Sequence, residues 1–159
     1  MSRPARIALT ASAVLLFVLV SGLVARVLAA QGAERTVLQQ SIAAQAAGDS
    51  KLAASLISNC PASSSCAKAV AEVVAKVKAP GQRAKVLQIE LGTKASPGGD
   101  IGVARIAWRI DGRLPVVECV VVERTGNAVS GFAVRINAVS KPIQREGHCG
   151  EVSSIKTGR

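Results

Sequence analysis

Aromatic and imidazole side chains are scarce in this chain of 159 residues. It has no tyrosine, two phenylalanines, one tryptophan and one histidine. Proteins that bind single-stranded nucleic acid stack the bases on aromatic rings, so this shortage argues against that function. Lysine and arginine outnumber the acidic residues 20 to 10, but the basic residues are dispersed along the sequence. We therefore predict no nucleic-acid partner.

The sequence also lacks the short motifs on which common enzyme chemistries depend. It contains no Gly-x-Ser-x-Gly, no His-Glu-x-x-His and no glycine-rich phosphate loop before a helix. The only histidine, His148, adjoins Cys149. Neighbours in an extended chain point apart, so a solvated histidine is a simpler interpretation than a Cys–His nucleophile. We predict no cofactor and no metal site, and we favour a non-catalytic role.

A long apolar run is the most prominent feature that the sequence does have. Residues Ile7 to Ala25 form a stretch of nineteen without a charge. As a helix this stretch is about 29 Å long, which matches the hydrocarbon core of a bilayer. Because Arg3 and Arg6 precede it, we place residues 1–6 in the cytoplasm and 7–28 in the membrane as a single-pass anchor. Residues 31–149 then form a domain outside the cytoplasm.

A cleaved signal peptide is the alternative to this anchor. The tripeptide Val27-Leu28-Ala29 is an acceptable cleavage site. However, the apolar run exceeds the usual signal length of about 7–15 residues, and Arg26 separates it from the cleavage site. We therefore expect an uncleaved signal anchor in the cell membrane, and a secreted domain if cleavage occurs.

Four cysteines lie in the part of the chain that we place outside the cytoplasm. Cys60 and Cys66 are too far apart for the Cys-x2–4-Cys pairs of zinc sites, and no Cys-x-x-Cys redox motif is present. An even number of cysteines in an exported domain favours structural disulfides. Of the three possible connectivities we predict Cys60–Cys66 with Cys119–Cys149. We expect Cys119 to face the core beside Val117 and Val121.

Apolar periodicity predicts three helices followed by four strands. The helices are expected at residues 34–47, 51–58 and 66–78, the second capped by Asp49 or Ser50 and the third by Ser64 or Ser65. The second helix should bury Leu52, Leu56 and Ile57. Alternating patterns then predict strands at 85–91, 101–110, 115–124 and 132–139, joined by short turns. The expected fold is α+β, with three helices packed on a four-stranded antiparallel meander, preceded by one transmembrane helix and followed by a flexible tail at 150–159.

Three residues of the predicted sheet are candidate ligand-binding residues: Glu118, Arg105 and Arg109. The strand around Glu118 is apolar on both faces, so a carboxyl that pointed into a cavity there would have a raised pKa. A cross-strand ion pair with Arg105 or Arg109 is the simpler alternative. The densest basic cluster, a solvated helix end or a contact for lipid or polymer, comprises Lys76, Lys78, Arg83 and Lys85. We expect Trp108 to be a core residue.

The order of these elements resembles the NTF2-like superfamily, also called SnoaL-like or cystatin-like. The resemblance rests on AAQAAGDSKLAASL and on the meander from VLQIEL to GFAVRINAVSKPI, over residues 34–143. It implies a curved roll with helices lying across the sheet. The chain is also similar to small single-anchor hypothetical proteins of high-GC bacteria, and Mce-associated proteins have the same layout. Enzymes of the superfamily use pocket Asp, His and Tyr residues, whereas this chain has no Tyr and its histidine lies outside the sheet.

These observations lead to one expected function and one alternative. We expect a membrane-anchored binding or assembly domain, non-catalytic, whose partner is an envelope protein, an anionic envelope polymer or an apolar ligand held on the concave side of the sheet. The alternative is a small-molecule enzyme of the SnoaL type with Glu118 as its acid or base.

Overall fold

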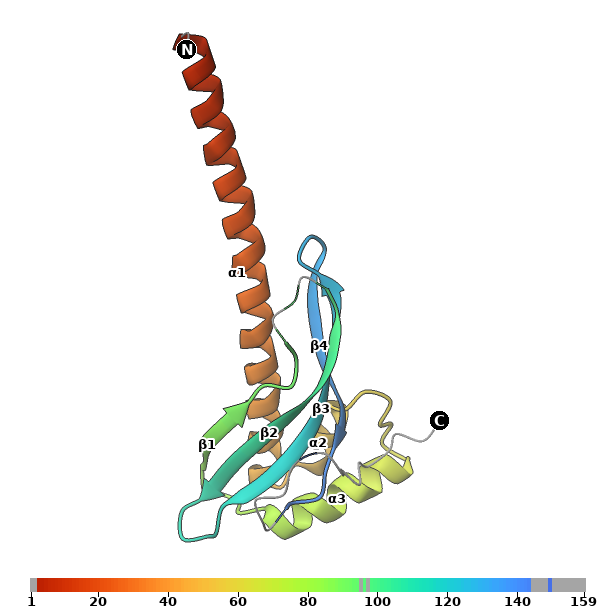
Figure 1. Ribbon diagram of the computed structural model, residues 1–159. Helices are drawn as coiled ribbons and strands as arrows, with labels where there is room; N and C mark the ends of the chain where they lie inside the picture. Colours follow the sequence, from red (N-terminus) through yellow and green to blue (C-terminus); the bar gives the residue numbers. More distant parts are fainter. Residues whose placement is uncertain (1–2, 95, 97, 144–148, 150–159) are drawn as a thin grey trace.

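The computed structural model describes residues 3–94, 96, 98–143 and 149 (Figure 1). The described part is α+β, with one long apolar helix at its N-terminus and a four-stranded antiparallel sheet. The elements in chain order are α1 (Arg3–Ala47), α2 (Ser50–Ser55), α3 (Ser65–Val77), β1 (Ala84–Glu90), β2 (Asp100–Ile110), β3 (Val116–Asn127) and β4 (Gly131–Val139).

Helix α1 runs for 45 residues, from the apolar N-terminal region into the folded domain (Figure 1). The predicted anchor and the helix expected at 34–47 are therefore one continuous helix, so the expected start of a separate helix at residue 34 was wrong. Gly32 is helical, and no proline interrupts the chain between the two parts. Residues before Ala30 are mostly exposed, whereas Ala30, Leu38 and Ile42 are buried. The N-terminal part of α1 is long and apolar enough to cross a membrane.

Helices α2 and α3 begin at the residues that capping chemistry favours. The Asp49 side chain accepts a hydrogen bond from Leu52 N at 2.9 Å, and Ser64 Oγ accepts one from Ala67 N at 3.2 Å. Each cap satisfies an amide that has no partner within its helix. The inner face of α3 carries four buried valines: Val70, Val73, Val74 and Val77.

The expected buried face of α2 is confirmed at Ile57, and in part at Leu56, but it is wrong at Leu52. Leu52 is 48% exposed, and the buried residues are Ala53, Ala54 and, just after the helix, Ile57. The helix ends at Ser55, and the chain after it joins the sheet, because Ser58 N donates to Ile136 O at 2.7 Å. That contact pairs the chain after α2 with the edge of β4.

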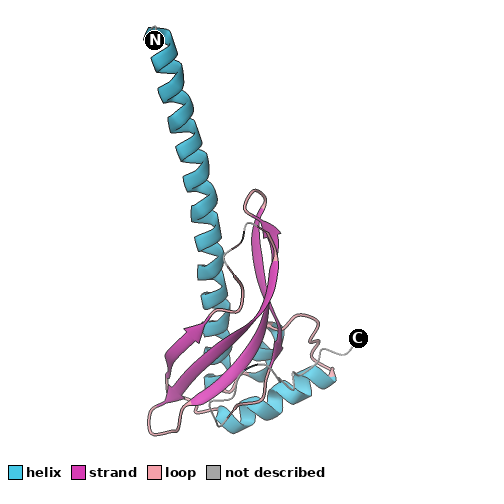
Figure 2. Cartoon of the chain, viewed as in Figure 1, coloured by secondary structure: helices cyan, strands magenta, loops and turns pink. Residues whose placement is uncertain are grey.

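The sheet is the predicted meander, with strand order β1-β2-β3-β4 (Figure 2). One face carries buried Ala104, Ile106, Trp108 and Ile110 of β2, and together with Val120 and Val122 of β3 these residues join the core with the helices. Helix α1 crosses this face and contacts β4, β1 and β2, while α2 and α3 pack on each other and on α1. Trp108 is fully buried, as predicted.

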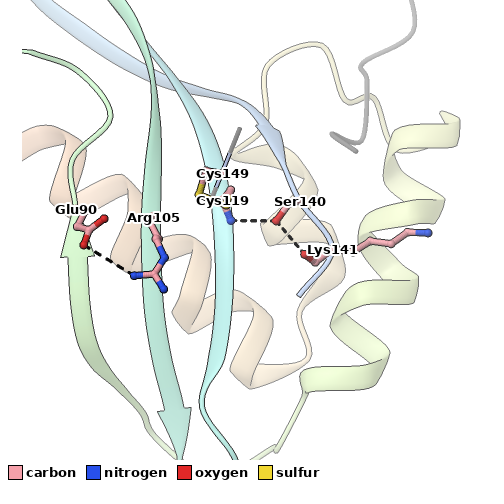
Figure 3. The surroundings of a disulfide bond; sticks show 6 residues. All are labelled: Glu90, Arg105, Cys119, Ser140, Lys141 and Cys149. Carbon is pink, nitrogen blue, oxygen red and sulfur yellow. Dashed lines mark hydrogen bonds and ion pairs between the residues drawn. A yellow bond between two sulfur atoms is a disulfide. The ribbon is translucent and has the colours of Figure 1, made fainter. Parts of the chain in front are cut away.

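Both predicted disulfides are present, Cys60–Cys66 and Cys119–Cys149. The expected environment of Cys119 was partly wrong. Cys119 alternates with Glu118 along β3 and pairs across the sheet with Arg105, so it lies on the face away from the helices. It is nevertheless fully buried, and it is bonded to Cys149 (Figure 3). Beside it, Ser140 continues the pairing of β4 with β3: Ser140 Oγ accepts from Cys119 N at 2.9 Å, and Ser140 N donates to Cys119 O at 2.8 Å.

Candidate functional site

Glu118 of β3 lies on the helix-facing side of the sheet with no exposed surface. Its Oε2 accepts a hydrogen bond from Gln45 Nε2 of α1 at 3.0 Å. Trp108, two residues along from its cross-strand partner Ile106, is the other polar group beside the carboxyl. The Trp108 Nε1 donor and the Glu118 Oε1 acceptor both lack a hydrogen-bond partner among the described residues.

Burial raises the pKa of Glu118 to about 7, and the Gln45 amide and the Trp108 indole oppose this rise. Desolvation dominates because a carboxylate at this position would lose its water and gain only weak donors. The Oε1 atom of Gln45 is also a buried acceptor without a partner in the described chain. A proton on Glu118 removes the negative charge that burial disfavours. The setting therefore favours the neutral carboxylic acid more than water does, and the acid form predominates below about pH 7.

The structure separates the three predicted ligand-binding residues. Arg105 lies on the opposite face of the sheet, where its Nη1 is 3.8 Å from Glu90 Oε1 of the neighbouring strand (Figure 3). Arg109 is exposed on the same outer face. The alternative of a cross-strand pair between Glu118 and these arginines is wrong: Glu118 pairs with Ile106, and successive residues of a strand point to opposite faces. Glu118 lines none of the three hollows found among the residues that the structure describes.

Two further buried charges hold the connection between β1 and β2, and sequence reasoning missed both. Glu34 of α1 accepts from Gly92 N at 2.7 Å and from Thr93 Oγ1. Arg124 of β3 is 1% exposed, and its Nη2 donates to Lys94 O at 2.7 Å and to Ser96 Oγ at 2.8 Å. Phe132 lies beneath this guanidinium, with the ring centre 5.0 Å away. In the sequence, Glu34 stands at the start of an amphipathic helix pattern, where an exposed charged residue is common. Only its contact with Gly92 and Thr93 in the folded chain shows its role.

The end of α3, the start of β1 and the β2–β3 turn lie at the end of the domain farthest from the N-terminus (Figure 1), and these segments carry basic residues that are dispersed in the sequence. Cross-strand pairing places Lys85 opposite Arg109, and Arg113 Nη1 donates to Lys78 O at 3.1 Å. We call this group the distal basic surface; its members, all exposed, are Lys76, Lys78, Arg83, Lys85, Arg109 and Arg113. Asp111, which is 3.2 Å from Lys85 Nζ, is the acidic residue among them.

The distal basic surface contains the whole basic cluster singled out in the sequence and adds two arginines to it. The four original members are exposed around the end of α3 and the start of β1, as a solvated helix end requires. Proximity in the sequence identified those four. Arg109 and Arg113 join them only through the pairing of β1 with β2 and the turn that follows β2.

Several predictions fall on residues outside those that the structure describes. These are the solvated His148 and the flexible tail at 150–159. Within the described ranges, no group of three or more His, Cys, Asp or Glu side chains is arranged to hold a metal ion.

Comparison of the chain with protein-family models, with curated proteins and with solved structures gives no match. The resemblance to the NTF2-like superfamily stays a prediction.

Proposed function

We propose that the chain is a single-pass membrane protein whose residues 31–149 form a non-catalytic binding domain outside the cytoplasm. In this proposal the distal basic surface binds an anionic polymer of the cell envelope. Oxidised Cys60–Cys66 and Cys119–Cys149 fit an oxidising compartment, and α1 supplies the anchor. The continuous helix between anchor and domain holds the distal basic surface away from the membrane (Figure 1).

The observation that carries the proposal is the concentration of exposed positive charge at this end of the domain. Six exposed basic residues surround one exposed acidic residue there. Such a field attracts polyanions and is screened by salt. The helix-facing side of the sheet, by contrast, is filled by Trp108, Leu38 and Ile42, which leaves outer surfaces for binding.

Polyanion binding is tested with the full-length chain in nanodiscs of uncharged lipid, with fluorescent inorganic polyphosphate as the probe. Replacing both Arg83 and Arg109 with glutamine should weaken binding several-fold and reduce its salt dependence. The matched control replaces Lys51 and Lys68, which are exposed on α2 and α3, with glutamine and so removes the same charge elsewhere. Equal weakening in both double variants would show that net charge alone attracts the polymer, and would contradict a role for the distal basic surface.

The compartment is tested separately by a reporter fused after Arg159. The proposal expects activity from a reporter that works only outside the cytoplasm. Mass spectrometry of the full chain without reductant should find no free thiols. A reporter active only in the cytoplasm, or four free thiols, would contradict the proposed location.

An enzyme of the SnoaL type with Glu118 as acid or base is the second candidate function. The favouring observation is a buried carboxyl whose pKa is raised to about 7, close to the value that suits proton transfer at neutral pH. Its lack of exposed surface weighs against it, because an acid or base must reach its substrate. If the Glu118→Gln variant loses a small-molecule activity that the Glu72→Gln variant keeps, the enzyme is supported.

A further inference from the structure

The turn between β3 and β4 lies against α1 at the height where the apolar run ends. Arg26 directly follows the nineteen uncharged residues, and its Nη1 donates to Ala128 O at 2.9 Å and also to Val129 O. These carbonyls are more than 100 positions away in the sequence, so the contact is a tertiary one. Figure 1 shows the β3–β4 hairpin extending along α1 toward the N-terminus.

The turn presents one apolar side chain to the outside and keeps a fixed shape. Ala128 is 4% exposed, whereas Val129 at the tip is 77% exposed. Asn127 Oδ1 accepts from Val129 N and from Ser130 N, each at 2.8 Å, which closes the turn. Gly131 follows with φ +98°, a conformation that suits glycine. The tip carries no charge, so nothing in it opposes contact with lipid.

The depth of this turn follows from the geometry of α1. The hydrocarbon core spans about 30 Å and the whole bilayer about 40–45 Å, so each headgroup layer is roughly 5–7 Å thick. A helix crosses such a layer in about four residues at about 1.5 Å each. If the apolar run Ile7–Ala25 fills the core, residues 26–30 lie among the headgroups. Ala30 is already buried by the domain, so no linker separates the domain from the bilayer.

We propose that the β3–β4 turn, residues Ala128–Ser130, is a membrane-surface contact in which Val129 enters the phospholipid headgroup layer and Arg26 holds the turn at that depth. Arginine beside a bilayer ordinarily reaches for lipid phosphate, and here the guanidinium is directed to the carbonyls of the turn instead. The domain thus touches the membrane at two places, α1 and the turn. The inference rests on the proposed function only in that residues 7–28 span the bilayer; it needs no polymer and no particular compartment.

A cleft at the same height agrees with a wet, lipid-facing site. It measures about 340 Å³ and lies between α1 and the start of β4. Its lining combines Arg26 and Ser130 with small or apolar residues, among them Ala29 and Phe132. The tip of the hairpin is therefore joined to α1 through Arg26 of the helix, while the space beside that contact stays open to headgroups.

The test uses the full-length chain in vesicles of phosphatidylcholine and phosphatidylglycerol, with an environment-sensitive NBD fluorophore on Val129→Cys. The native cysteines are disulfide-bonded, so labelling without reductant is specific to the new thiol. Leu114→Cys is the matched control, because Leu114 is 87% exposed in the turn at the other end of β3. We expect blue-shifted emission at residue 129, quenched by lipids that carry a nitroxide on the headgroup, and water-like, unquenched emission at residue 114.

Other outcomes contradict the proposal in distinguishable ways. Water-like emission at residue 129 in a chain that floats with the vesicles overturns the contact and leaves the anchor intact. A blue shift without lipid quenching shows that the turn meets protein, such as a second copy. A chain that does not float overturns the anchor, and the contact with it. In the labelled chain, Arg26→Gln should reduce the quenching, whereas Arg35→Gln, an exposed arginine farther along α1, should not.

Discussion

At the scale of single residues, Glu118 shows how one buried carboxyl makes the stability of the fold depend on pH. Its partner Gln45 donates one hydrogen bond at 3.0 Å, and no cation among the described residues pairs with it. The folded state therefore binds a proton on Glu118 more tightly than the unfolded chain does, with a pKa of about 7 against 4.5. This contribution to stability is complete below about pH 4.5 and is lost as the pH rises through about 7.

Replacing Glu118 with glutamine should remove this dependence. The free energy of unfolding of the unmodified chain should fall by up to about 3 kcal/mol between pH 4.5 and 8, since each pKa unit corresponds to about 1.4 kcal/mol. The Glu118→Gln variant should lose less across the same range and be relatively more stable at pH 8. Chemical denaturation of the full chain in detergent at several pH values measures this. Glu72→Gln, at an exposed position of α3, should keep the original profile; a profile unchanged in Glu118→Gln would contradict the raised pKa.

Glu34 is the residue that joins α1 to the connection between β1 and β2. Replacing it with alanine removes the charged acceptor of Gly92 N and Thr93 Oγ1, and should lower the free energy of unfolding by roughly 2–4 kcal/mol. Hydrogen exchange at the Gly92 amide should accelerate at the same time. Arg35→Ala, at the next and exposed position, is the control and should change little. Slow exchange at Gly92 in Glu34→Ala would mean that other contacts hold this loop.

At the scale of elements, local sequence patterns predicted the caps, strands and disulfides better than they predicted which faces are buried. The caps Asp49 and Ser64, the four-strand meander and both disulfides follow from residue type and period. The face of β3 that packs against the helices could not be predicted in the same way. That strand is apolar on both faces, so the sequence pattern does not show on which face Glu118 lies. The register at β1 is shifted by a bulge between Val86 and Gln88, a backbone irregularity that no side-chain pattern announces.

Buried charge was the other feature that sequence reasoning could not place. Glu34 and Arg124 Nη2 form hydrogen bonds with backbone groups of Gly92, Lys94 and Gly98 and with the side chains of Thr93 and Ser96, all distant in sequence from both. Backbone carbonyls and amides exist at every position and leave no signature in the residue pattern. The partners of these two side chains are therefore visible only once the fold brings that segment to them.

The two disulfides should differ in what they contribute, because they close loops of different length. Their sequence separations are 6 for Cys60–Cys66 and 30 for Cys119–Cys149. In the chain-entropy model this corresponds to about 2 and about 3.5 kcal/mol. Replacing Cys119 and Cys149 with alanine should therefore cost more stability than replacing Cys60 and Cys66. Chemical denaturation of the two double variants checks the order, and the reverse order would show that local strain or packing outweighs loop entropy.

At the scale of the whole molecule, the continuity of α1 determines how the domain stands on the membrane. Because the helix has no break, its direction in the membrane also fixes its direction in the domain, which packs on it from Ala30 onward. The twelve residues of β3 extend for roughly 40 Å from the turn near Arg26 to the distal end. The proposed polymer-binding surface and the proposed membrane contact thus lie at opposite ends of one strand. An upright domain would present its basic residues away from the headgroups of its own bilayer.

This orientation leads to a prediction about an insertion between Val27 and Leu28. Four residues of Gly-Ser-Gly-Ser there should break the helix, because glycine and serine are poor helix formers and the Arg26 contact is lost with the register. The domain should remain folded, since the buried face of α1 begins after the insertion at Ala30. Freed to tilt, it should bring residue 114 closer to the lipid surface on average. Energy transfer from a donor on Leu114→Cys to acceptor-labelled headgroups should therefore rise. Four inserted alanines are the control: they continue the helix, so they should move the domain away from the bilayer and leave the energy transfer low. Equal transfer in both insertions would show that something other than the continuous helix sets the orientation.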